Sequence, residues 1–89
     1  MVKQPVKIIN QLGLHARPAA LIAQTAGTFS CEIHLIKDNV SVDAKSIMGV
    51  MMLAAEHGST LQLTADGVDE NEAVAAIKAL FDNKFNEEF

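Results

Sequence analysis

The sequence has 89 residues, of which 49% are hydrophobic and 20% are charged, and its formal net charge is -4. This composition argues against a disordered chain, and the length predicts one compact domain over residues 1–89 and excludes a second one. Lysines and arginines are scattered singly and Tyr and Trp are absent, which argues against a nucleic-acid-binding protein.

The sequence also argues against membrane insertion, an internal disulfide and a metal site. No apolar run approaches the roughly 18 residues of a spanning helix, and residues 1–15 lack the pattern of a signal peptide, so we expect a cytoplasmic protein. Cys31 has no partner for an internal disulfide, and His15, His34 and His57 are too widely spaced for a compact ligand set. We therefore expect no metal and no cofactor, a monomer that folds by packing alone, and solvated side chains at His34 and His57.

The first elements are an edge strand and a helix. Residues 2–9 alternate apolar and polar side chains, which predicts a strand, and Pro5 confines that strand to a sheet edge. Residues 16–26 are rich in alanine and aliphatic side chains and are followed by Gly27, which predicts a helix with Gly27 at its C′ position.

A hairpin comes next. Residues 31–36 alternate again and predict a strand with Cys31 on its buried, apolar face. The Lys-Asp-Asn run at 37–39 predicts a turn into an antiparallel strand that contains Val40 and Val42.

Two more elements follow the hairpin. A short helix is expected to begin with Ser46 as its N-cap and to end near Gly58. Leu61, Leu63 and Ala65 then restore the period of two that predicts a fourth strand.

The last element is an amphipathic helix. Asp69 and Glu72 have the spacing of a capping box at its start. The apolar residues at helical spacing are Ala73, Val74, Ile77, Leu80, Phe81 and Phe85. The resulting order, βαββαβα, predicts a two-layer α+β fold with helices on one face of a largely antiparallel sheet, and leaves the strand order open.

His15 carries the most specific chemistry. It lies at the start of the first helix in LGLHARPAA, where unpaired N–H groups and the positive end of the helix dipole favour an anion. Arg17 adds a permanent cation, and Pro18 fits the first turn because it needs no hydrogen-bond donor there. An imidazole that attacks phosphorus must be neutral, and these charges disfavour the imidazolium and stabilise a phosphorylated product. Taken alone, a histidine beside a helix start is more often an exposed turn residue.

Two motifs, LGLHARPAA and KSIMGVMML, decide between these interpretations, because together they resemble the HPr family of the bacterial phosphoenolpyruvate-dependent phosphotransferase system. The resemblance covers nearly the whole chain. It implies that His15 accepts a phosphoryl group on Nδ1 from enzyme I and passes it to an enzyme II A domain, with Arg17 as charge partner. The chain would then be a carrier protein and not an enzyme. The implied fold is an open-faced β-sandwich with sheet order 1-4-2-3 and three helices on one face.

The second motif adds a regulatory hypothesis. Ser46 is expected to cap its helix, and the resemblance implies that it is also phosphorylated by an ATP-dependent HPr kinase. A phosphate at a helix start is locally favourable, so we expect it to act on partner association and to leave the fold intact.

The same helix predicts a docking surface. If Val50 and Leu53 are buried, the side chains of Ile47, Met48 and Met51 lie largely on the other side, and exposed methionines suit a surface that accepts several partners. The resemblance implies that enzyme I and enzyme II dock on this helix and around His15. The expected partner-binding residues are Leu14, Ala16, Pro18, Ala20, Leu21, Ile47, Met48, Gly49 and Met51.

Some features depart from the sugar-type pattern. Leu12 stands where many relatives have a small polar residue that bonds to the imidazole, which leaves the resting geometry of His15 open. The ending IKALFDNKFNEEF is more similar to the nitrogen-related NPr branch. An alternative function is therefore a regulatory phosphoprotein without a direct part in sugar transport. A third interpretation, a small-ligand domain, predicts a cavity among Ile8, Ile33 and Leu63.

Overall fold

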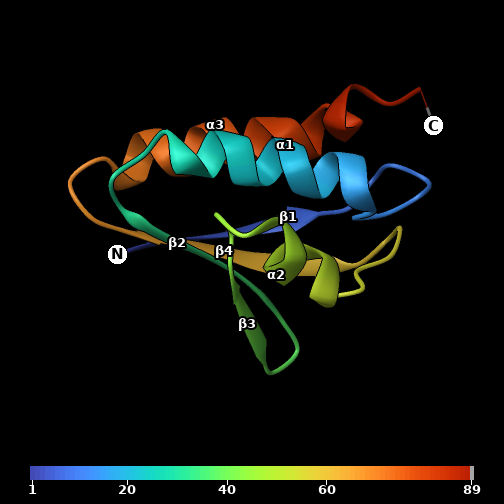
Figure 1. Ribbon diagram of the computed structural model, residues 1–89, viewed down its shortest axis with the longest axis horizontal. Helices are drawn as coiled ribbons and strands as arrows, with labels where there is room; N and C mark the ends of the chain where they lie inside the picture. The colour runs from blue at the N-terminus through green and yellow to red at the C-terminus, as the bar shows by residue number, and fades with distance from the viewer. Residues whose placement is uncertain (89) are drawn as a thin grey trace.

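The computed structural model describes residues 1–88, which form a four-stranded antiparallel sheet and three α-helices (Figure 1). The elements follow one another as β1 (Val2–Lys7), α1 (Ala16–Gly27), β2 (Glu32–Lys37), β3 (Val40–Asp43), α2 (Ile47–Met52), β4 (Thr60–Asp66), α3 (Glu70–Asp82) and the 3₁₀ turn η1 (Lys84–Asn86). The predicted order βαββαβα is confirmed, with the short turn added at its end. Within this described range, every helix is too short or too polar to cross a membrane.

The strands lie in the order β1-β4-β2-β3, and each neighbouring pair is antiparallel. β1 and β3 are therefore the edges, and Pro5 stands in an edge strand, as its missing N–H predicted. Lys37 pairs with Val40, so Asp38 and Asn39 form the expected tight turn between β2 and β3.

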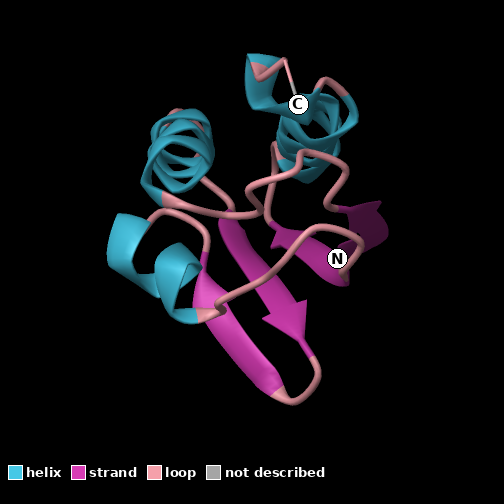
Figure 2. Cartoon of the chain, turned by 90° about the vertical axis from the view of Figure 1, so that its right-hand side faces the viewer, coloured by secondary structure: helices cyan, strands magenta, loops and turns pink. Residues whose placement is uncertain are grey.

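The helices cover one face of the sheet and leave the other open, as Figure 2 shows. α1 and α3 lie side by side across the sheet, and α2 packs beside α1 (Figures 1 and 2). Alternate strand residues and one stripe of each long helix share a single buried cluster. Its largest members include Ile22 of α1, Leu35 of β2, Leu63 of β4 and Ile77 of α3. The periods of two and 3.6 read from the sequence therefore point to the same core.

α2 ends earlier than predicted. It stops at Met52 and does not reach Gly58, because the chain turns away to meet the loop before α1. Ala54 adopts a left-handed φ of 50°, and the buried Ala55 accepts a hydrogen bond of 3.1 Å from the N–H of Leu14. This tertiary bond uses a carbonyl that a continuing helix would need for its own ladder.

Gly27 does not take the predicted C′ position, because it is the last residue of α1 itself. Thr28 follows with a right-handed φ of -80°. Its N–H and its hydroxyl both donate to the carbonyl of Thr25, at 3.2 and 2.7 Å. The helix end is thus satisfied without a left-handed glycine.

The predicted capping box at the start of α3 is also wrong. Asp69 precedes the helix, but its carboxylate accepts hydrogen bonds from the N–H groups of Ser30 and Cys31, at 2.8 and 2.9 Å. The Ser30 bond holds the pKa of this carboxyl below its usual range. Glu70 accepts instead from the N–H of Gly67 at 3.0 Å. Asp69 therefore ties the start of β2 to the start of α3.

Phe85 was expected to continue the helical stripe of α3 but lies beyond its end. α3 ends at Asp82, and Phe85 sits in η1 with a left-handed φ of 54°. Its ring is nevertheless fully buried, 4.9 Å from that of Phe81 and in an edge-to-face arrangement. The reversal of the chain at Phe85 directs the following residues back toward the start of α1.

Candidate functional site

His15 occupies the N-cap position of α1, with an extended backbone and a carbonyl that accepts the first helical bond from Ala19 at 3.0 Å. Its side chain makes no capping hydrogen bond, and 37% of it is exposed. The imidazole therefore stands beside the first-turn amides of α1 without using them. Pro18 lies within that first turn, as the sequence predicted. The arrangement leaves a partly exposed ring where negative charge is favoured.

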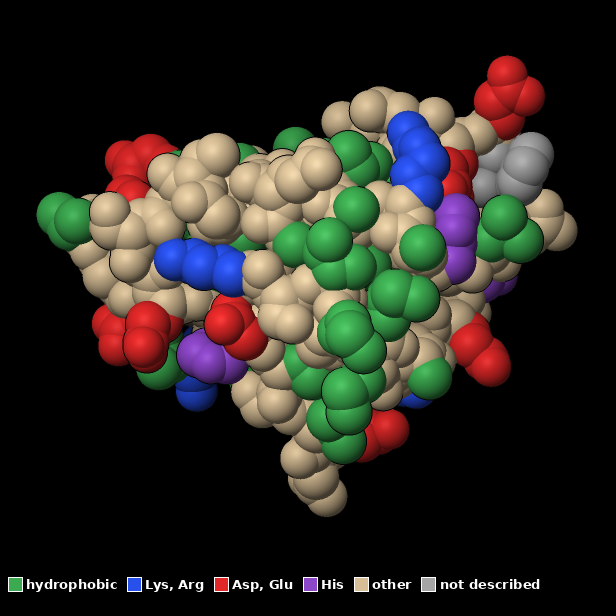
Figure 3. All heavy atoms as spheres, viewed as in Figure 1, with side chains coloured by type: hydrophobic (Ala, Val, Ile, Leu, Met, Phe, Trp, Pro, Cys, Tyr) green, Lys and Arg blue, Asp and Glu red, His purple; other side chains and the backbone are tan. Residues whose placement is uncertain are grey.

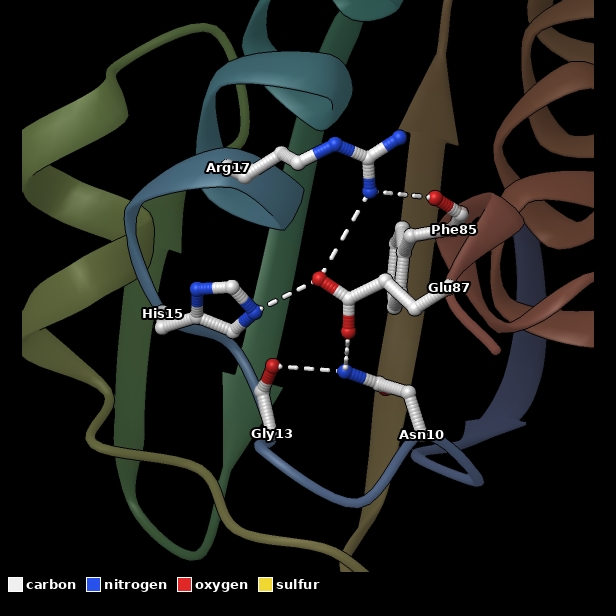
Figure 4. Close-up of polar contacts among 6 residues, drawn as sticks. All are labelled: Asn10, Gly13, His15, Arg17, Phe85 and Glu87. Carbon is white, nitrogen blue, oxygen red and sulfur yellow. Dashed lines mark hydrogen bonds and ion pairs between the residues drawn. The ribbon is translucent and has the colours of Figure 1, made fainter. Parts of the chain in front are cut away.

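One nitrogen of the ring is bound to a residue from the other end of the chain. His15 Nε2 lies 2.7 Å from Glu87 Oε2, as Figure 4 shows. Since a carboxylate only accepts, Nε2 is the donor of this bond, and a neutral ring then carries its lone pair on Nδ1. Nδ1 lies on the side of the ring away from Glu87 (Figure 4). The ring is oriented with one nitrogen occupied and the other available.

Arg17 reaches toward the same C-terminal segment. Its Nη1 donates to the carbonyl of Phe85 at 2.6 Å and lies 3.5 Å from Glu87 Oε2. The Glu87 carboxylate thus lies between the guanidinium and the imidazole (Figure 4). Half of the Arg17 side chain is exposed, so the cation remains close to any anion that arrives at the helix start.

Asn10 also binds the Glu87 carboxylate. Its Nδ2 donates to Glu87 Oε1 at 2.9 Å and to the carbonyl of Gly13 at 2.8 Å. Its Oδ1 is buried with no partner among the described residues. The sequence predicted neither Asn10 nor Glu87 as a site residue, because no local pattern links two residues 77 positions apart.

Ser46 forms the predicted cap of α2. Its Oγ accepts a hydrogen bond of 3.0 Å from the N–H of Gly49, and its side chain is half-buried. A Cβ added to Gly49 would meet Ser46 Oγ at 3.3 Å and the carbonyl oxygen of Asp43 at 3.3 Å, so this start of the helix is closely packed.

The expected apolar surface is present on α2. Val50 and Leu53 are buried, whereas Met48 is 73% exposed and Ile47, Met51 and Met52 are also exposed. We call these four exposed side chains, Ile47, Met48, Met51 and Met52, the apolar patch. In Figure 3 hydrophobic side chains gather over this region of the surface.

The other expected partner-binding residues divide into two groups. Ala16 is exposed, and Ala20, Leu21 and Gly49 are partly so. Leu14 and Pro18 are buried at the start of α1, so neither offers an exposed side chain to the docking surface in which the sequence placed them. Leu14 belongs to the main hydrophobic cluster, and its N–H donates to the carbonyl of Ala55, whereas Pro18 is one of the buried residues of α1.

Leu12 and the remaining residues singled out in the sequence lie as follows. Leu12 is exposed and lines a surface hollow together with Arg17 and Glu87. His34 is half-buried in β2 and His57 is exposed in a turn.

Cys31 is buried, as predicted, and burial raises the pKa of its thiol, with the Asp69 carboxylate adding to the effect. In residues 1–88 no three His, Cys, Asp or Glu side chains gather in a group that could hold a metal ion.

The packing of the core argues against the third interpretation, a small-ligand domain. Ile8, Ile33 and Leu63, which would have lined a ligand cavity, are buried members of the main hydrophobic cluster. Their side chains fill the space between sheet and helices.

Comparison with known proteins decides the family. Residues 2–83 match the family model PTS-HPr, described as the PTS HPr component phosphorylation site. The chain belongs to the HPr family. It is 53% identical to the phosphocarrier protein HPr of Treponema pallidum, over 99% of this chain and 100% of that one. It is 52% identical to the phosphocarrier protein HPr of Cupriavidus necator, over 98% of each chain.

A solved structure of the family agrees with the fold. The crystal structure of HPr-C-His from Thermoanaerobacter tengcongensis superposes with a TM-score of 0.95 at 49% identity, covering 100% of both chains. The open-faced arrangement with strand order 1-4-2-3 and three helices is thus the fold of the family, and the chain is a phosphocarrier protein of the HPr type.

Proposed function

We propose that this phosphocarrier accepts a phosphoryl group on His15 from phosphoenolpyruvate-charged enzyme I and passes it to enzyme II A domains during sugar uptake. In both steps it is the protein substrate and needs no cofactor of its own. The observation that carries the proposal is the His15 ring, partly exposed at the start of α1, with Nε2 bound to Glu87 and Nδ1 on the opposite side.

The geometry supports an in-line transfer. The Nδ1 lone pair attacks phosphorus while the bond from phosphorus to the donor nitrogen breaks, and the donor nitrogen keeps that electron pair. Charge on the transferring oxygens is stabilised by the first-turn amides of α1 and by Arg17. For this, the Arg17 guanidinium exchanges its bond to the Phe85 carbonyl for one to the phosphoryl group.

The apolar patch provides the docking surface in this proposal. Methionine side chains repack at low cost, which suits one surface that meets enzyme I and enzyme II A domains in turn. A carrier that exchanges partners quickly needs fast dissociation, and a small apolar surface supplies affinity without a large interface. Enzyme I takes the phosphoryl group from phosphoenolpyruvate, and the enzyme II A domains receive it from the carrier. In this proposal the carrier acts in the cytoplasm as a monomer, without membrane insertion.

Ser46 would add regulation to the same surface. Its hydroxyl caps α2 directly before the apolar patch, so a kinase that phosphorylates Ser46 would place about -1.5 to -2 charges at the edge of that patch. The helix start tolerates the charge, whereas a partner that buries apolar surface there does not. HPr kinase/phosphorylase is the partner implied for this step.

The test is phosphorylation of the purified chain by enzyme I and phosphoenolpyruvate, followed by intact mass measurement. The proposal predicts a gain of one acid-labile phosphoryl group, lost in His15→Ala and kept in the matched variants His34→Ala and His57→Ala. No gain in the unaltered chain, or a gain that persists in His15→Ala, would refute it.

The alternative is a regulatory phosphoprotein of a nitrogen-type relay, or one that docks on a metabolic regulator, without a direct part in sugar transport. It is supported by the C-terminal segment, which resembles the nitrogen-related branch and contacts His15 through Glu87. A phosphorylated chain that transfers its phosphate to no sugar-specific enzyme II A domain of its host would favour this function over the first.

A further inference from the structure

The Glu87 carboxylate is part of the His15 site, yet carrier chemistry at Nδ1 does not by itself require it. We infer that Glu87 is a positioning residue for phosphoryl transfer. Its carboxylate keeps the ring proton of His15 on Nε2 and so leaves the lone pair on Nδ1 for the phosphoryl group. The inference rests on the proposed carrier function of His15, and it adds a residue 72 positions away to the machinery.

The contacts of Glu87 determine where its oxygens point. The side chain is only 10% exposed, and a carboxylate buried to that degree needs hydrogen-bond donors. Oε1 accepts from Asn10 Nδ2 at 2.9 Å, and Oε2 accepts from His15 Nε2 at 2.7 Å. Asn10 is itself fully buried and uses its Nδ2 a second time, on the Gly13 carbonyl at 2.8 Å. The amide is thereby oriented, and the carboxylate with it.

The turn η1 brings Glu87 to this position. Lys84, Phe85 and Asn86 have φ values of 55°, 54° and 61°, a left-handed conformation that disfavours residues other than glycine. The buried Phe85 ring and the 2.6 Å bond from Arg17 Nη1 to the Phe85 carbonyl hold the turn in place. Strain of this kind persists only where the surroundings over-determine it, and here the turn returns the chain to the start of α1.

The proton on Nε2 has a consequence for both transfers. When Nδ1 forms its bond to phosphorus, Nε2 keeps its hydrogen, so the ring becomes a phosphorylated imidazolium, and the adjacent Glu87 carboxylate compensates the positive charge. On onward transfer the bond from Nδ1 to phosphorus breaks, the electron pair returns to Nδ1, and the neutral ring is restored. The leaving group is therefore a neutral imidazole, and no proton has to move in either step.

A conservative substitution separates this role from simple structural support. In Glu87→Gln the side-chain shape is kept, but its single amide oxygen cannot accept from both Asn10 Nδ2 and His15 Nε2. Either Asn10 or the imidazole then faces an N–H group. The matched control is Glu88→Gln, which removes the same charge from the exposed neighbouring residue.

The experiment measures the ring nitrogens of His15 by ¹⁵N NMR at about pH 8, where histidines are ordinarily neutral, and the rate of phosphorylation by enzyme I in parallel. In the unaltered chain and in Glu88→Gln, the proton is expected on Nε2. In Glu87→Gln the form with the proton on Nδ1 becomes populated, and phosphorylation slows about tenfold. Glu87→Ala, which removes both acceptor oxygens, is expected to slow it as well.

The outcomes separate the inference from the function on which it rests. A proton on Nδ1 in the unaltered chain overturns the inference without any variant, and so does a Glu87→Gln variant with unchanged ring signals and rate. Failure of the unaltered chain to acquire a phosphoryl group on His15 overturns the proposed function instead, whatever the ring signals show. Amide spectra of residues distant from the site verify that the variants are folded.

Discussion

Gly13 passes so close to Ala55 that a Cβ at position 13 would lie 2.6 Å from the Ala55 carbonyl oxygen. Gly13 also has a φ of 72°, in the left-handed region that side chains disfavour. The loop before His15 therefore depends on a glycine where it meets the chain that leaves α2, and the position of the site depends on that crossing.

Gly13→Ala is expected to lower the free energy of unfolding by about 2 kcal/mol or more, because it adds backbone strain and a backbone clash. Urea unfolding followed by circular dichroism measures this loss. Gly27→Ala is the matched control: a Cβ there meets nothing within 4 Å at the end of α1, so stability should be unchanged or rise by about 0.5 to 1 kcal/mol. Equal losses in the two variants would contradict the prediction.

Phe85→Ala should be among the most destabilising single substitutions in the chain. It removes a fully buried ring and its edge-to-face contact with Phe81, at a cost of about 3 to 5 kcal/mol in unfolding free energy. The exposed Met52 provides the control, and Met52→Ala should stay within about 0.5 kcal/mol of the unaltered chain. Thermal unfolding of both variants checks the difference.

Asp69→Asn should make stability less dependent on pH in the acid range. The bonds from Ser30 and Cys31 lower the pKa of this carboxyl in the folded state, so the stabilisation is present above its unfolded pKa and is lost as the pH falls through its folded pKa. The unfolding free energy of the unaltered chain should therefore exceed that of Asp69→Asn. This difference should be larger at about pH 7 than at about pH 3. Asp38→Asn, in the exposed hairpin turn, is the comparison, and a constant difference for Asp69→Asn at both pH values would contradict the assignment.

Ser46→Ala and Ser46→Asp should separate capping from charge. Loss of the cap in Ser46→Ala should lower the unfolding free energy by about 1 kcal/mol, whereas aspartate keeps an acceptor for the Gly49 N–H and should preserve stability. Only Ser46→Asp should slow phosphoryl transfer from enzyme I, because it adds negative charge beside the apolar patch. Ser41→Asp, on the exposed edge strand β3, should leave the transfer unaffected.

Met48→Glu should weaken docking without affecting the fold. Met48 is 73% exposed, so unfolding free energy should change by less than about 0.5 kcal/mol, while KM for the chain as substrate of enzyme I should rise about tenfold. Val68→Glu is the control, because Val68 is 95% exposed in the loop between β4 and α3. If both variants raise KM equally, net charge and not the apolar patch controls docking.

Local structure followed from local pattern in most of the chain. The alternation through Ile33 and Leu35 predicted a strand and its buried face, and the cap at Ser46 was correct because a capping bond spans only three residues. The exposure of Met48 followed in the same way from burial of Val50, since both depend on the turn angle of one helix. The resemblance in LGLHARPAA added the proposed role of His15, because the chemistry of the residue alone did not separate it from an ordinary exposed turn residue.

The errors occurred where a local preference met a distant partner. Asp69 has the residue type and spacing of a cap. Its carboxylate instead accepts a hydrogen bond from the N–H of Cys31, which lies 38 positions away, just before β2. α2 had no sequence signal to stop at Met52, because the stop comes from the bond between Ala55 and Leu14.

The sequence by itself determined the succession of elements and their inward faces, and it singled out His15 for the proposed phosphoryl transfer, because each depends on residues within a few positions of one another. The local patterns left the strand order open; the family resemblance implied the order 1-4-2-3, and the structure confirmed it. The tertiary structure alone decided the early end of α2 and the bond between Glu87 and His15. These features depend on which surfaces pack together after the chain has folded back on itself, and contacts of that kind leave no periodic trace in the order of residues.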